Sequence, residues 1–413
     1  MNFTLGILDK NTTSINPKEL ERAIDYINDY WDKLIVRQEK TTTTLFGLPN
    51  PYVVPSKNED NFQFNEQYYW DSFFISIGLI ESGKNDLAEG MLENLFYMFE
   101  CFKMIPNANR FYMTGRSQPP ILTSYIDLIF KSNNKNKAWL KRAFKIAEKE
   151  YWNVWRSSVH PHWREVYKGL SRYYDINDLH DLAEAESGWD MTPRFERKTL
   201  DFLPIDLNCL LYKYEIDFAK FSDILGNKKS QRKWLKKAEL RRKTVNELMW
   251  NRSKNFFFDY NFINKNQNSV WSLASFYAMW TGLADEEQAR QMVKNLDKFT
   301  YEGGVSTTTR DIFNVNLFGS HSTQWAYPNG WAPLHFIVIE GLKNYGYDKQ
   351  AKELTSKWLK TNLTWFNAHG EFLEKYNIVN PEKPPINGVY PSQTGFGWTN
   401  AIFLYLAKRY IKE

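Results

Sequence analysis

Apolar side chains recur at steps of three and four residues through most of this 413-residue chain, the spacing of one face of an α-helix. The clearest stripes cover residues 85–104, 203–225, 229–249 and 348–365. Gly226 and Gly346 lie just upstream of the last two stripes and are expected to end the preceding helices. Weaker stripes predict further helices near residues 18–38, 70–82, 120–132, 136–154, 270–281, 286–297, 331–344 and 396–411. The pattern therefore predicts about twelve helices and almost no strands.

The helix count separates two all-helical architectures. An α-solenoid should show a fixed sequence period, and none is visible here. An (α/α)6 barrel, in which six helix pairs close into a ring, requires twelve helices. No Pro/Gly/Ser-rich linker or low-complexity segment divides the chain, and ring folds of this length occur as one unit. We therefore predict an all-α fold, an (α/α)6 barrel with long loops, formed by residues 1–413 as a single domain.

Five connecting segments are longer than simple links between helices need to be. They cover residues 41–67, 105–119, 155–201, 299–330 and 366–395. Loops beyond about 12–15 residues are uncommon in a compact domain unless they have a function. Trp, Tyr and Phe make up 17% of the chain, and in these loops they stand beside Arg, Asn, Gln and acidic residues. Most aromatic side chains are expected to fill the core, but this mixture is typical of a sugar pocket, where rings stack on C–H faces.

Charge and cysteine content argue against several other classes of protein. The 53 Lys and Arg and 48 Asp and Glu give a net charge of +5 without a basic block, so no nucleic-acid partner is expected. Cys101 and Cys209 lack the spacing of a zinc site or a disulfide framework, and both are expected to be buried thiols. The N-terminus lacks the pattern of a leader, and no stretch approaches the ~18 apolar residues of a membrane span. We expect a soluble, cytoplasmic protein with no membrane partner.

A metal site is the next hypothesis to weigh. His160 and His162 form an HxH pair, but neither nearby cysteines nor an HExxH spacing supports metal binding, so surface histidines are favoured. No metal ion and no organic cofactor are expected.

Six loop segments carry a distinctive set of residues. One contains Phe64, Glu66, Tyr68, Trp70 and Asp71, and another contains Gln324, Trp325, Pro328, Gly330, Trp331 and Pro333. The others are RSQPP at 116–120, ESGWD at 186–190, EKY at 374–376 and TGFGWTN at 394–400. In this order, over about residues 50–412, they resemble the motifs of the trehalase family of glycoside hydrolases, among them PGGRFxExYxWDxY and QWDxPxGWxP. Together the matches are highly specific, although each alone would be weak.

The resemblance implies an inverting hydrolase with two catalytic carboxyl groups. Asp190 would protonate the leaving oxygen and Glu374 would activate a water on the opposite face, which requires ~6.5–9.5 Å between the two groups. Trp189 could raise the pKa of Asp190 by desolvation. The alternatives are that Asp190 caps a helix and that Glu374 is a solvated partner of Lys375. Glu371 is the substitute base.

The resemblance also implies a binding shell around the sugar. It comprises Phe64, Tyr68, Trp70, Asp71, Asn107, Arg116, Gln118, Arg172, Gly188, Gln324 and Trp325. Aromatic rings would pack against the sugar, and polar side chains would bond its hydroxyl groups. Gly188 would let the backbone approach the sugar because it has no Cβ. Arg172 is carried over on a loose local match, and a surface ion pair is its alternative.

The chain departs from the family pattern at three positions. Gln63 stands in place of an arginine, Ala326 in place of the aspartate of QWD, and Val389 in place of a glutamate before YP. Each change removes a charged group able to bind sugar hydroxyls, a contact worth ~1.5–3 kcal/mol. We therefore expect a small-molecule α-glucoside as substrate, α,α-trehalose first and glucosylglycerate, mannosylglycerate or another small α-glucoside second.

Two further classes remain as alternatives. A non-catalytic sugar-binding protein on the same ring would have no need of an acid and a base. An isoprenoid cyclase ring would need an Asp-rich DDxxD segment, which the sequence lacks. The oligomeric state stays open, and a monomer is plausible.

Overall fold

The computed structural model describes residues 15–57, 64–314, 323–388 and 390–412. Each of the twelve stretches in which a helix was predicted contains one. They are α1 (Pro17–Leu34), α2 (Tyr69–Glu81), α3 (Asn85–Phe102), α4 (Leu122–Ser132), α5 (Lys137–Glu150), α7 (Ile205–Ile224), α8 (Lys228–Met249), α9 (Tyr277–Trp280), α10 (Glu286–Lys294), α11 (Ala332–Asn344), α12 (Asp348–His369) and α13 (Gly397–Lys412). A further short helix, α6 (His180–Glu186), lies in a segment predicted to be a loop.

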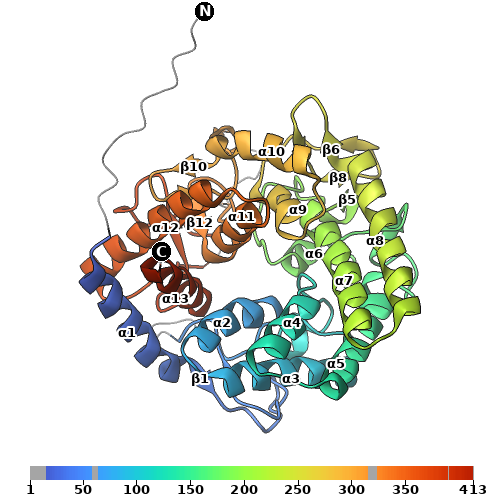
Figure 1. The fold of residues 1–413 in the computed structure, drawn as a ribbon, viewed down its shortest axis with the longest axis horizontal. Coiled ribbons are helices and arrows are strands. Elements are labelled where there is room, and N and C mark those ends of the chain that lie inside the picture. Colours follow the sequence, from blue (N-terminus) through green and yellow to red (C-terminus); the bar gives the residue numbers. More distant parts are fainter. Residues whose placement is uncertain (1–14, 58–63, 315–322, 389, 413) are drawn as a thin grey trace, which may run out of the picture.

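The helices form a closed ring of two layers (Figure 1). In the inner layer α2, α4, α7, α9, α11 and α13 follow one another, and α13 packs back against α2. The outer layer consists of α1, α3, α5, α8, α10 and α12. Inner helices are buried nearly all round, as α2 is from Tyr69 to Leu79, whereas α8 buries one stripe that includes Trp234 and Val245. The predicted (α/α)6 barrel is confirmed.

Local sequence signals account for several helix ends. Gly226 and Gly346 follow α7 and α11 with φ of +78° and +74°, a conformation that glycine adopts without strain, so both predicted stops are confirmed. Asn16 accepts a hydrogen bond from the backbone N–H of Lys18 at the start of α1. The side chains of Asp285 and Gln288 form a capping box on α10.

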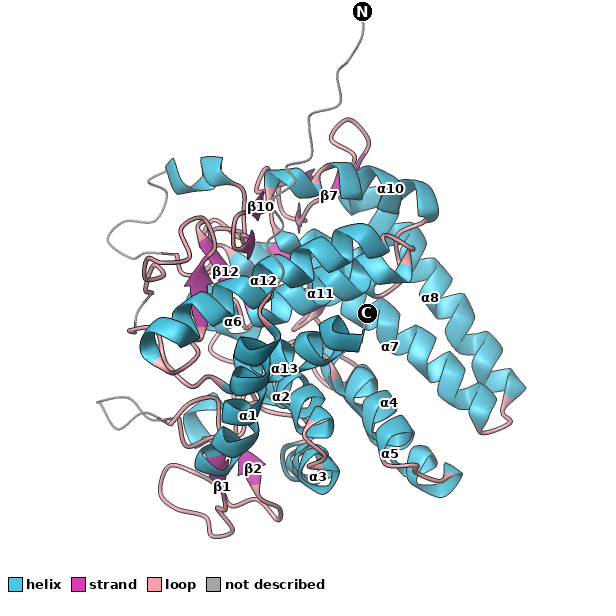
Figure 2. Cartoon of the chain, turned by 60° about the vertical axis from the view of Figure 1, so that its left-hand side comes forward, coloured by secondary structure: helices cyan, strands magenta, loops and turns pink. Residues whose placement is uncertain are grey.

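Short antiparallel strands occupy the segments between the helices, where the sequence predicted almost no strands (Figure 2). They are β1 (Ile35–Val36), β2 (Tyr52–Val53), β3 (Glu165–Tyr167), β4 (Leu170–Ser171), β5 (Phe202–Leu203), β6 (Trp250–Asn251), β7 (Phe256–Phe257), β8 (Tyr260–Asn261), β9 (Asn266–Gln267), β10 (Thr300–Tyr301), β11 (Gly304–Val305), β12 (Asn329–Trp331) and β13 (Lys375–Asn377). The strand at residues 35–36 replaces the end of the helix that was predicted near 18–38. The pair β12–β13 joins two of the motif-bearing segments, because Gly330 lies opposite Tyr376 and Trp331 opposite Lys375.

The two cysteines differ in exposure. Cys209 is buried in the inner helix α7, as expected. Cys101 is exposed, because it lies in the last turn of the outer helix α3, which buries only one of its faces. The prediction of two buried thiols is therefore wrong for Cys101.

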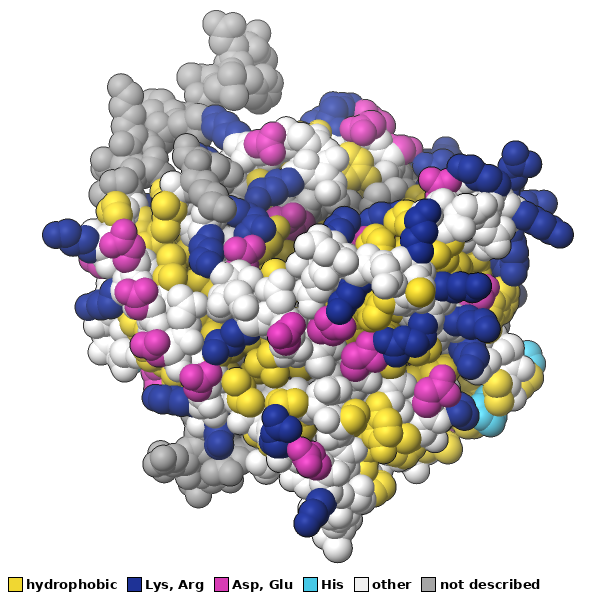
Figure 3. Space-filling model, turned by 60° about the horizontal axis from the view of Figure 1, so that its bottom comes forward, with side chains coloured by type: hydrophobic (Ala, Val, Ile, Leu, Met, Phe, Trp, Pro, Cys, Tyr) yellow, Lys and Arg dark blue, Asp and Glu magenta, His cyan; other side chains and the backbone are white. Residues whose placement is uncertain are grey.

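Two observations concern the molecular surface and the helix lengths. On the face seen in Figure 3, basic and acidic side chains are interspersed over most of the surface. Among the described residues, no helix combines the length and the apolar composition that a membrane span requires.

Candidate active site

The motif-bearing loops meet around a cavity of about 200 Å³. Its walls are formed by Pro55, Phe64, Tyr68, Trp70, Asp71, Asn107, Tyr112, Met113, Arg116, Gln118, Ala185, Gly188, Asp190, Trp325, Trp331, Glu374, Tyr390, Phe396 and Trp398. Eleven of the thirteen site residues predicted from the sequence are among them, and the other two are Arg172 and Gln324. Residues that lie more than 300 positions apart in the sequence therefore meet at one site.

Asp190, the predicted acid, follows α6 and reaches the cavity from a segment held by Gln324. Gln324 Nε2 donates a hydrogen bond of 2.5 Å to the backbone oxygen of Asp190. Burial raises the pKa of the Asp190 carboxyl to about 7, the negative charge of Glu374 adds to this rise, and Lys375 and Arg116 oppose it. A carboxyl group with such a pKa still carries protons near neutral pH, as a general acid must. No helix begins at Asp190, so the capping alternative is wrong.

Glu374, the predicted base, is buried immediately before β13. Its Oε2 accepts a hydrogen bond of 2.6 Å from Lys375 Nζ, and its Oε1 accepts one of 2.9 Å from the Tyr390 hydroxyl. Its backbone oxygen accepts from the indole N–H of Trp398 and from the hydroxyl of Thr399. The Glu374–Lys375 pair is thus buried on both sides, and the alternative of a solvated pair is wrong.

Asp71 is a third carboxyl group at the cavity, in the first turn of α2. Burial raises its pKa to about 8, the charges of Asp190 and Glu374 raise it further, and a hydrogen bond with Gln118 opposes the rise. The Gln118 Oε1 atom in turn accepts from the backbone N–H of Trp70 at 2.9 Å. Because a protonated carboxyl group both donates and accepts hydrogen bonds, Asp71 can bind a hydroxyl group in either sense near neutral pH.

Stacked indole rings form one wall of the cavity. The rings of Trp325 and Trp331 lie parallel, 3.8 Å apart, and Trp189 stacks on Trp325 at 5.3 Å. Trp70 and Trp398 pack against the same block at ring separations of 6.1 and 6.3 Å from Trp325. Such a stack loses little side-chain freedom when a ligand binds, so it presents a rigid face to a sugar ring.

Asn107 and Arg116 come from the segment between α3 and α4 and are only partly engaged by the protein. Asn107 Nδ2 donates to the backbone oxygens of Ser117 and Ala185 at 3.1 and 3.3 Å. Arg116 Nη1 lies 3.2 Å from Asp175 Oδ2, while its buried Nε has no hydrogen-bond partner among the described residues. The guanidinium group thus retains a donor for a ligand.

Arg172 and Gln324 lie outside the cavity wall for different reasons. Arg172 donates to the backbone oxygens of Trp163 and Leu200 at 2.9 and 2.7 Å, and it packs on the ring of Tyr174. Its guanidinium group therefore holds loop backbone segments together. It is not part of the cavity wall, and among the described residues it forms no ion pair. Gln324 is fully buried behind Asp190, where it holds the Asp190 backbone.

Several cavity residues were not predicted as part of the site. Trp331 and Trp398 belong to the matched motifs, so a signal for them was present in the sequence. Tyr390 follows Val389 directly and could have been found in the same way. Tyr112 carried no such signal. Of the three departures from the family pattern, Ala326 is buried next to Trp325, whereas Gln63 and Val389 lie outside the described residues.

Neither the histidine pair nor a second cavity has the aromatic and carboxyl groups of the candidate active site. His160 and His162 are exposed, as expected, and His160 stacks on Trp163. The described residues contain no cluster of three or more side chains suited to hold a metal ion.

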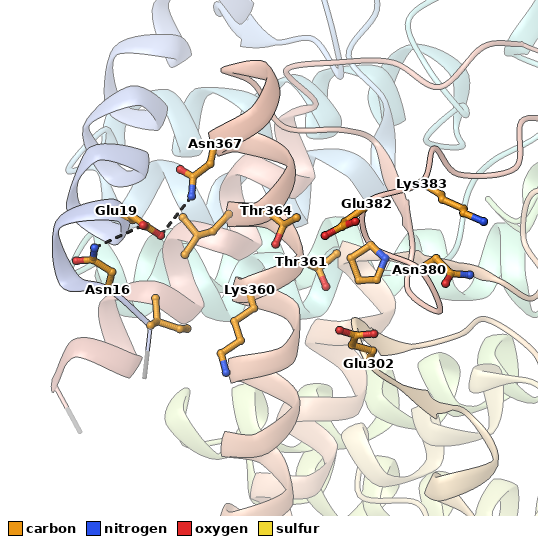
Figure 4. Close-up of a pocket in the computed structure, with 13 residues that line it drawn as sticks. Asn16, Glu19, Glu302, Lys360, Thr361, Thr364, Asn367, Asn380, Glu382 and Lys383 are labelled. Carbon is orange, nitrogen blue, oxygen red and sulfur yellow. Dashed lines mark hydrogen bonds between the residues drawn. The ribbon is translucent and has the colours of Figure 1, made fainter. Parts of the chain in front are cut away.

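A larger cavity, of about 650 Å³, lies between the start of α1, the second half of α12 and residues 380–383 (Figure 4). Its described wall includes no aromatic side chain, and Asn16 and Asn367 hydrogen-bond Glu19 there.

Comparison with known proteins agrees with these motifs. The family model described as Trehalase matches residues 9–179 and 162–411. The chain is 33% identical to the cytosolic neutral trehalase of Kluyveromyces lactis and 34% identical to the cytosolic neutral trehalase of Saccharomyces cerevisiae. These alignments cover 88% and 87% of this chain. The chain spans 57% of the length of each of these two relatives.

Solved structures extend the comparison to the fold. The neutral trehalase Nth1 from Saccharomyces cerevisiae superposes with a TM-score of 0.82 at 27% identity, covering 95% of this chain and 94% of that one. The GH63 mannosylglycerate hydrolase from Thermus thermophilus, in complex with glucose, superposes with a TM-score of 0.70 over 93% of this chain and 99% of that one. At 15% identity, the latter likeness concerns the fold alone. The chain belongs to the trehalase family.

Proposed function

We propose that this chain is an inverting glycoside hydrolase that cleaves α,α-trehalose into two glucose molecules. The proposal rests on one observation: two buried carboxyl groups lie at the same aromatic cavity, but the charged groups around them differ. Asp190 is desolvated and near the negative charge of Glu374, which favours its protonated form. Glu374 forms a buried ion pair with the ammonium of Lys375 at 2.6 Å. An acid and a base in separate settings are what glycoside hydrolysis with inversion requires.

In the proposed reaction, Asp190 donates its proton to the oxygen that links the two sugars as the bond from this oxygen to the anomeric carbon breaks. A water molecule attacks the same carbon from the opposite face, and Glu374 takes the proton that this water loses. The products are β-glucose from the attacked ring and glucose from the leaving ring. Proton exchange with solvent then restores Asp190 and Glu374 to their starting states.

The remaining cavity residues are proposed to bind the substrate. The indole stack around Trp325 would pack against the C–H face of the attacked ring, and Asp71, Arg116 and Gln118 would bond its hydroxyl groups. Gln324 would act through the backbone of Asp190, by fixing the direction in which the acid points. We assign no substrate contact to Arg172.

The site residues specify the leaving sugar less than the attacked ring. Ala326 stands in place of a family aspartate, so the chain has fewer charged groups to grip a second glucose. Glucosylglycerate, mannosylglycerate and other small α-glucosides are therefore the alternative substrates, and a non-catalytic sugar-binding protein is the alternative function. Relatives named cytosolic support a cytoplasmic location. We further propose that residues 1–413 act as one catalytic domain on a small carbohydrate, without nucleic acid or membrane.

A substrate panel tests the proposal. The purified protein is incubated with trehalose, glucosylglycerate, mannosylglycerate, kojibiose and maltose, and kcat/KM is compared, with Asp190→Asn protein as the control for contaminating activity. We expect trehalose to have the highest kcat/KM. If another sugar ranks far above trehalose, the substrate is wrong but the hydrolase stands. Calorimetric binding of trehalose without turnover of any sugar would favour the non-catalytic binder.

A further inference from the structure

Three carboxyl groups, those of Asp71, Asp190 and Glu374, face one cavity. Neighbouring carboxylates in a buried site do not all ionise together near neutral pH, because each negative charge raises the cost of the next. Hydrolysis with an acid and a base requires one particular distribution of protons, with Glu374 ionised and Asp190 protonated. Some feature of the site must select this distribution over the others.

Lys375 is the cation placed to make this selection. Its Nζ lies 2.6 Å from Oε2 of Glu374, and both side chains are almost completely buried. The described residues contain no ion pair that involves Asp71 or Asp190. Lys375 therefore favours the ionised form of one of the three carboxyl groups by direct contact and leaves the other two to the effect of burial.

The fold keeps the ammonium of Lys375 in place. The pairing of β12 with β13 sets Lys375 opposite Trp331, and Nζ lies 5.0 Å from the centre of that indole ring. The ring of Tyr390 lies on another side at 5.6 Å, and the Tyr390 hydroxyl bonds the second oxygen of Glu374. Aromatic faces stabilise a buried cation without competing with its carboxylate partner. Among the described residues, the ammonium thus has a single anionic partner in contact, Glu374.

The other titratable groups around Glu374 do not provide this selection. Tyr390 approaches from the loop before α13 as a neutral hydroxyl donor. Asp71 from α2 and Asp190 from the segment after α6 carry the same sign of charge as Glu374. Arg116 acts on Asp190 from a distance and makes its ion pair with Asp175. Lys375 is therefore the group whose removal should change which carboxyl is ionised.

We propose that Lys375 is a positioning residue that assigns the two catalytic roles, because its ammonium holds Glu374 as the ionised carboxylate and Glu374 in turn holds the proton on Asp190. This inference rests on the proposed function of the same site. It predicts that Lys375 controls the protonation state of the site and not merely its shape.

The first test is the pH profile of kcat/KM in Lys375→Met, whose side chain has similar length without charge. The acidic limb of the profile should move to higher pH by about 1–3 units, the usual effect of one charge in contact with a carboxyl group. Lys375→Arg should keep the wild-type position of this limb even if turnover falls. Lys213→Met is the matched control, since Lys213 pairs with Asp217 on α7 away from the cavity, and its profile should stay unchanged.

The result that would overturn the proposal is a Lys375→Met profile with both limbs at wild-type pH and only lower turnover, since a structural role predicts that outcome. If Lys375→Met fails to fold, as judged by circular dichroism, Lys375→Gln carries the same test and the same expected shift. Gln keeps a hydrogen-bond donor for Glu374 without the charge.

A second readout does not depend on activity. Infrared difference spectra between Lys375→Met and wild type at neutral pH should show a new band from the protonated carboxyl group of Glu374, even if Asp190 loses its proton in exchange. This band should vanish when both proteins carry Glu374→Gln. Absence of the band in the first comparison contradicts the proposal. If the wild type hydrolyses no α-glucoside, the proposed function fails, and this spectrum still decides whether Lys375 controls the ionisation of Glu374.

Discussion

The backbone of Gly188 packs directly against the indole ring of Trp70. With a φ of +70°, a Cβ atom at position 188 would lie 2.9 Å from Cε2 and Cζ2 of that ring, closer than non-bonded carbon atoms approach. Gly188 also lines the cavity, so its predicted close approach to the sugar stays a prediction, and the close approach within the protein is to the Trp70 side chain. Gly188 thereby joins the segment that carries Asp190 to the wall that carries Trp70.

Gly188→Ala should therefore impair both stability and activity. A left-handed φ costs a non-glycine residue ~1–2 kcal/mol, and displacement of Trp70 adds to this cost and moves the cavity wall. Gly226→Ala is the matched control, since Gly226 has a φ of +78° with no atom within 4 Å of a built Cβ. We expect urea unfolding to show a larger loss for Gly188→Ala and kcat/KM for trehalose to fall only in that variant. Equal losses in the two variants would refute the role of the Trp70 contact.

Removal of either proposed catalytic carboxyl group should abolish most turnover. Asp190→Asn and Glu374→Gln preserve side-chain shape but remove the acid and the base, and each should lower kcat by about 10²–10⁴-fold or more. Glu371→Gln is the control because Glu371, although three residues from Glu374, is not part of the cavity wall. Its steady-state kcat should equal that of the wild type. A normal kcat in Glu374→Gln together with a low one in Glu371→Gln would transfer the role of base to Glu371.

Arg116 and Arg172, both predicted to bind the sugar, should differ in the effect of their substitution. Arg116→Lys removes the unpaired buried Nε at the cavity and should lower kcat/KM about tenfold or more, because Lys cannot reproduce the geometry of a guanidinium group. Arg172→Lys should lose a backbone contact to Trp163 or Leu200 and reduce the free energy of unfolding by ~1–2 kcal/mol. Its kcat/KM should stay near the wild-type value. A raised KM with unchanged stability in Arg172→Lys would restore Arg172 to the binding shell.

The ring could be predicted from sequence because each long helix has a periodic apolar pattern. Helix α6 could not, since its seven residues make only two turns and bury little apolar surface beyond Ala183. The strands escaped detection because they are two or three residues long, too short for alternation to be seen. Their pairing depends on segments far apart in the chain, as in β12 with β13, and that is a property of the tertiary structure.

The site was predicted from motifs, and its errors occur where a side chain has two equally plausible partners. In the sequence, Arg172 beside two tyrosines is compatible with a guanidinium group that binds sugar and equally with one that binds backbone oxygens. The contacts of the folded loop distinguish the two. The alternative of a solvated Glu374–Lys375 pair rested on the adjacency of the two residues in the sequence. Their burial arises from the pairing with β12 and from the ring of Trp331, neither of which is visible in the local sequence.

Buried acids near the cavity should make the protein less stable as pH rises. Burial raises the pKa of Glu184 to about 8 from its usual value of 4.5, and the pKa of Glu150 to about 7. Between these values the folded state holds more protons than the unfolded state, so the free energy of unfolding falls as pH increases from about 4.5 to 8. Glu184→Gln removes one such group while its Oε1 can still accept from Thr192.

We therefore expect Glu184→Gln to be more stable than the wild type at pH 8–9 by about 1–3 kcal/mol, with little difference near pH 5. Urea unfolding at both pH values measures this. Glu247→Gln, at an exposed position on α8, should keep the fall in stability between pH 5 and 8. An identical pH dependence of stability in Glu184→Gln and the wild type would show that the pKa of Glu184 is not raised in the folded protein.

The stereochemistry of the first product tests the arrangement of Asp190 and Glu374 most directly. If the base acts through a water molecule on the face opposite to the acid, the glucose released from the attacked ring of trehalose must be the β-anomer. If Glu374 instead attacked the sugar itself, the carboxyl groups would need a separation of only ~5–5.5 Å and two displacements would return the α-anomer. The leaving glucose keeps its α-configuration in either case. Proton NMR in the first minutes, before mutarotation, should therefore show equal amounts of the two anomers for inversion and the α-anomer alone for retention. The Glu374→Gln protein supplies the background spectrum, and an excess of α-glucose in the wild type would contradict the inverting mechanism.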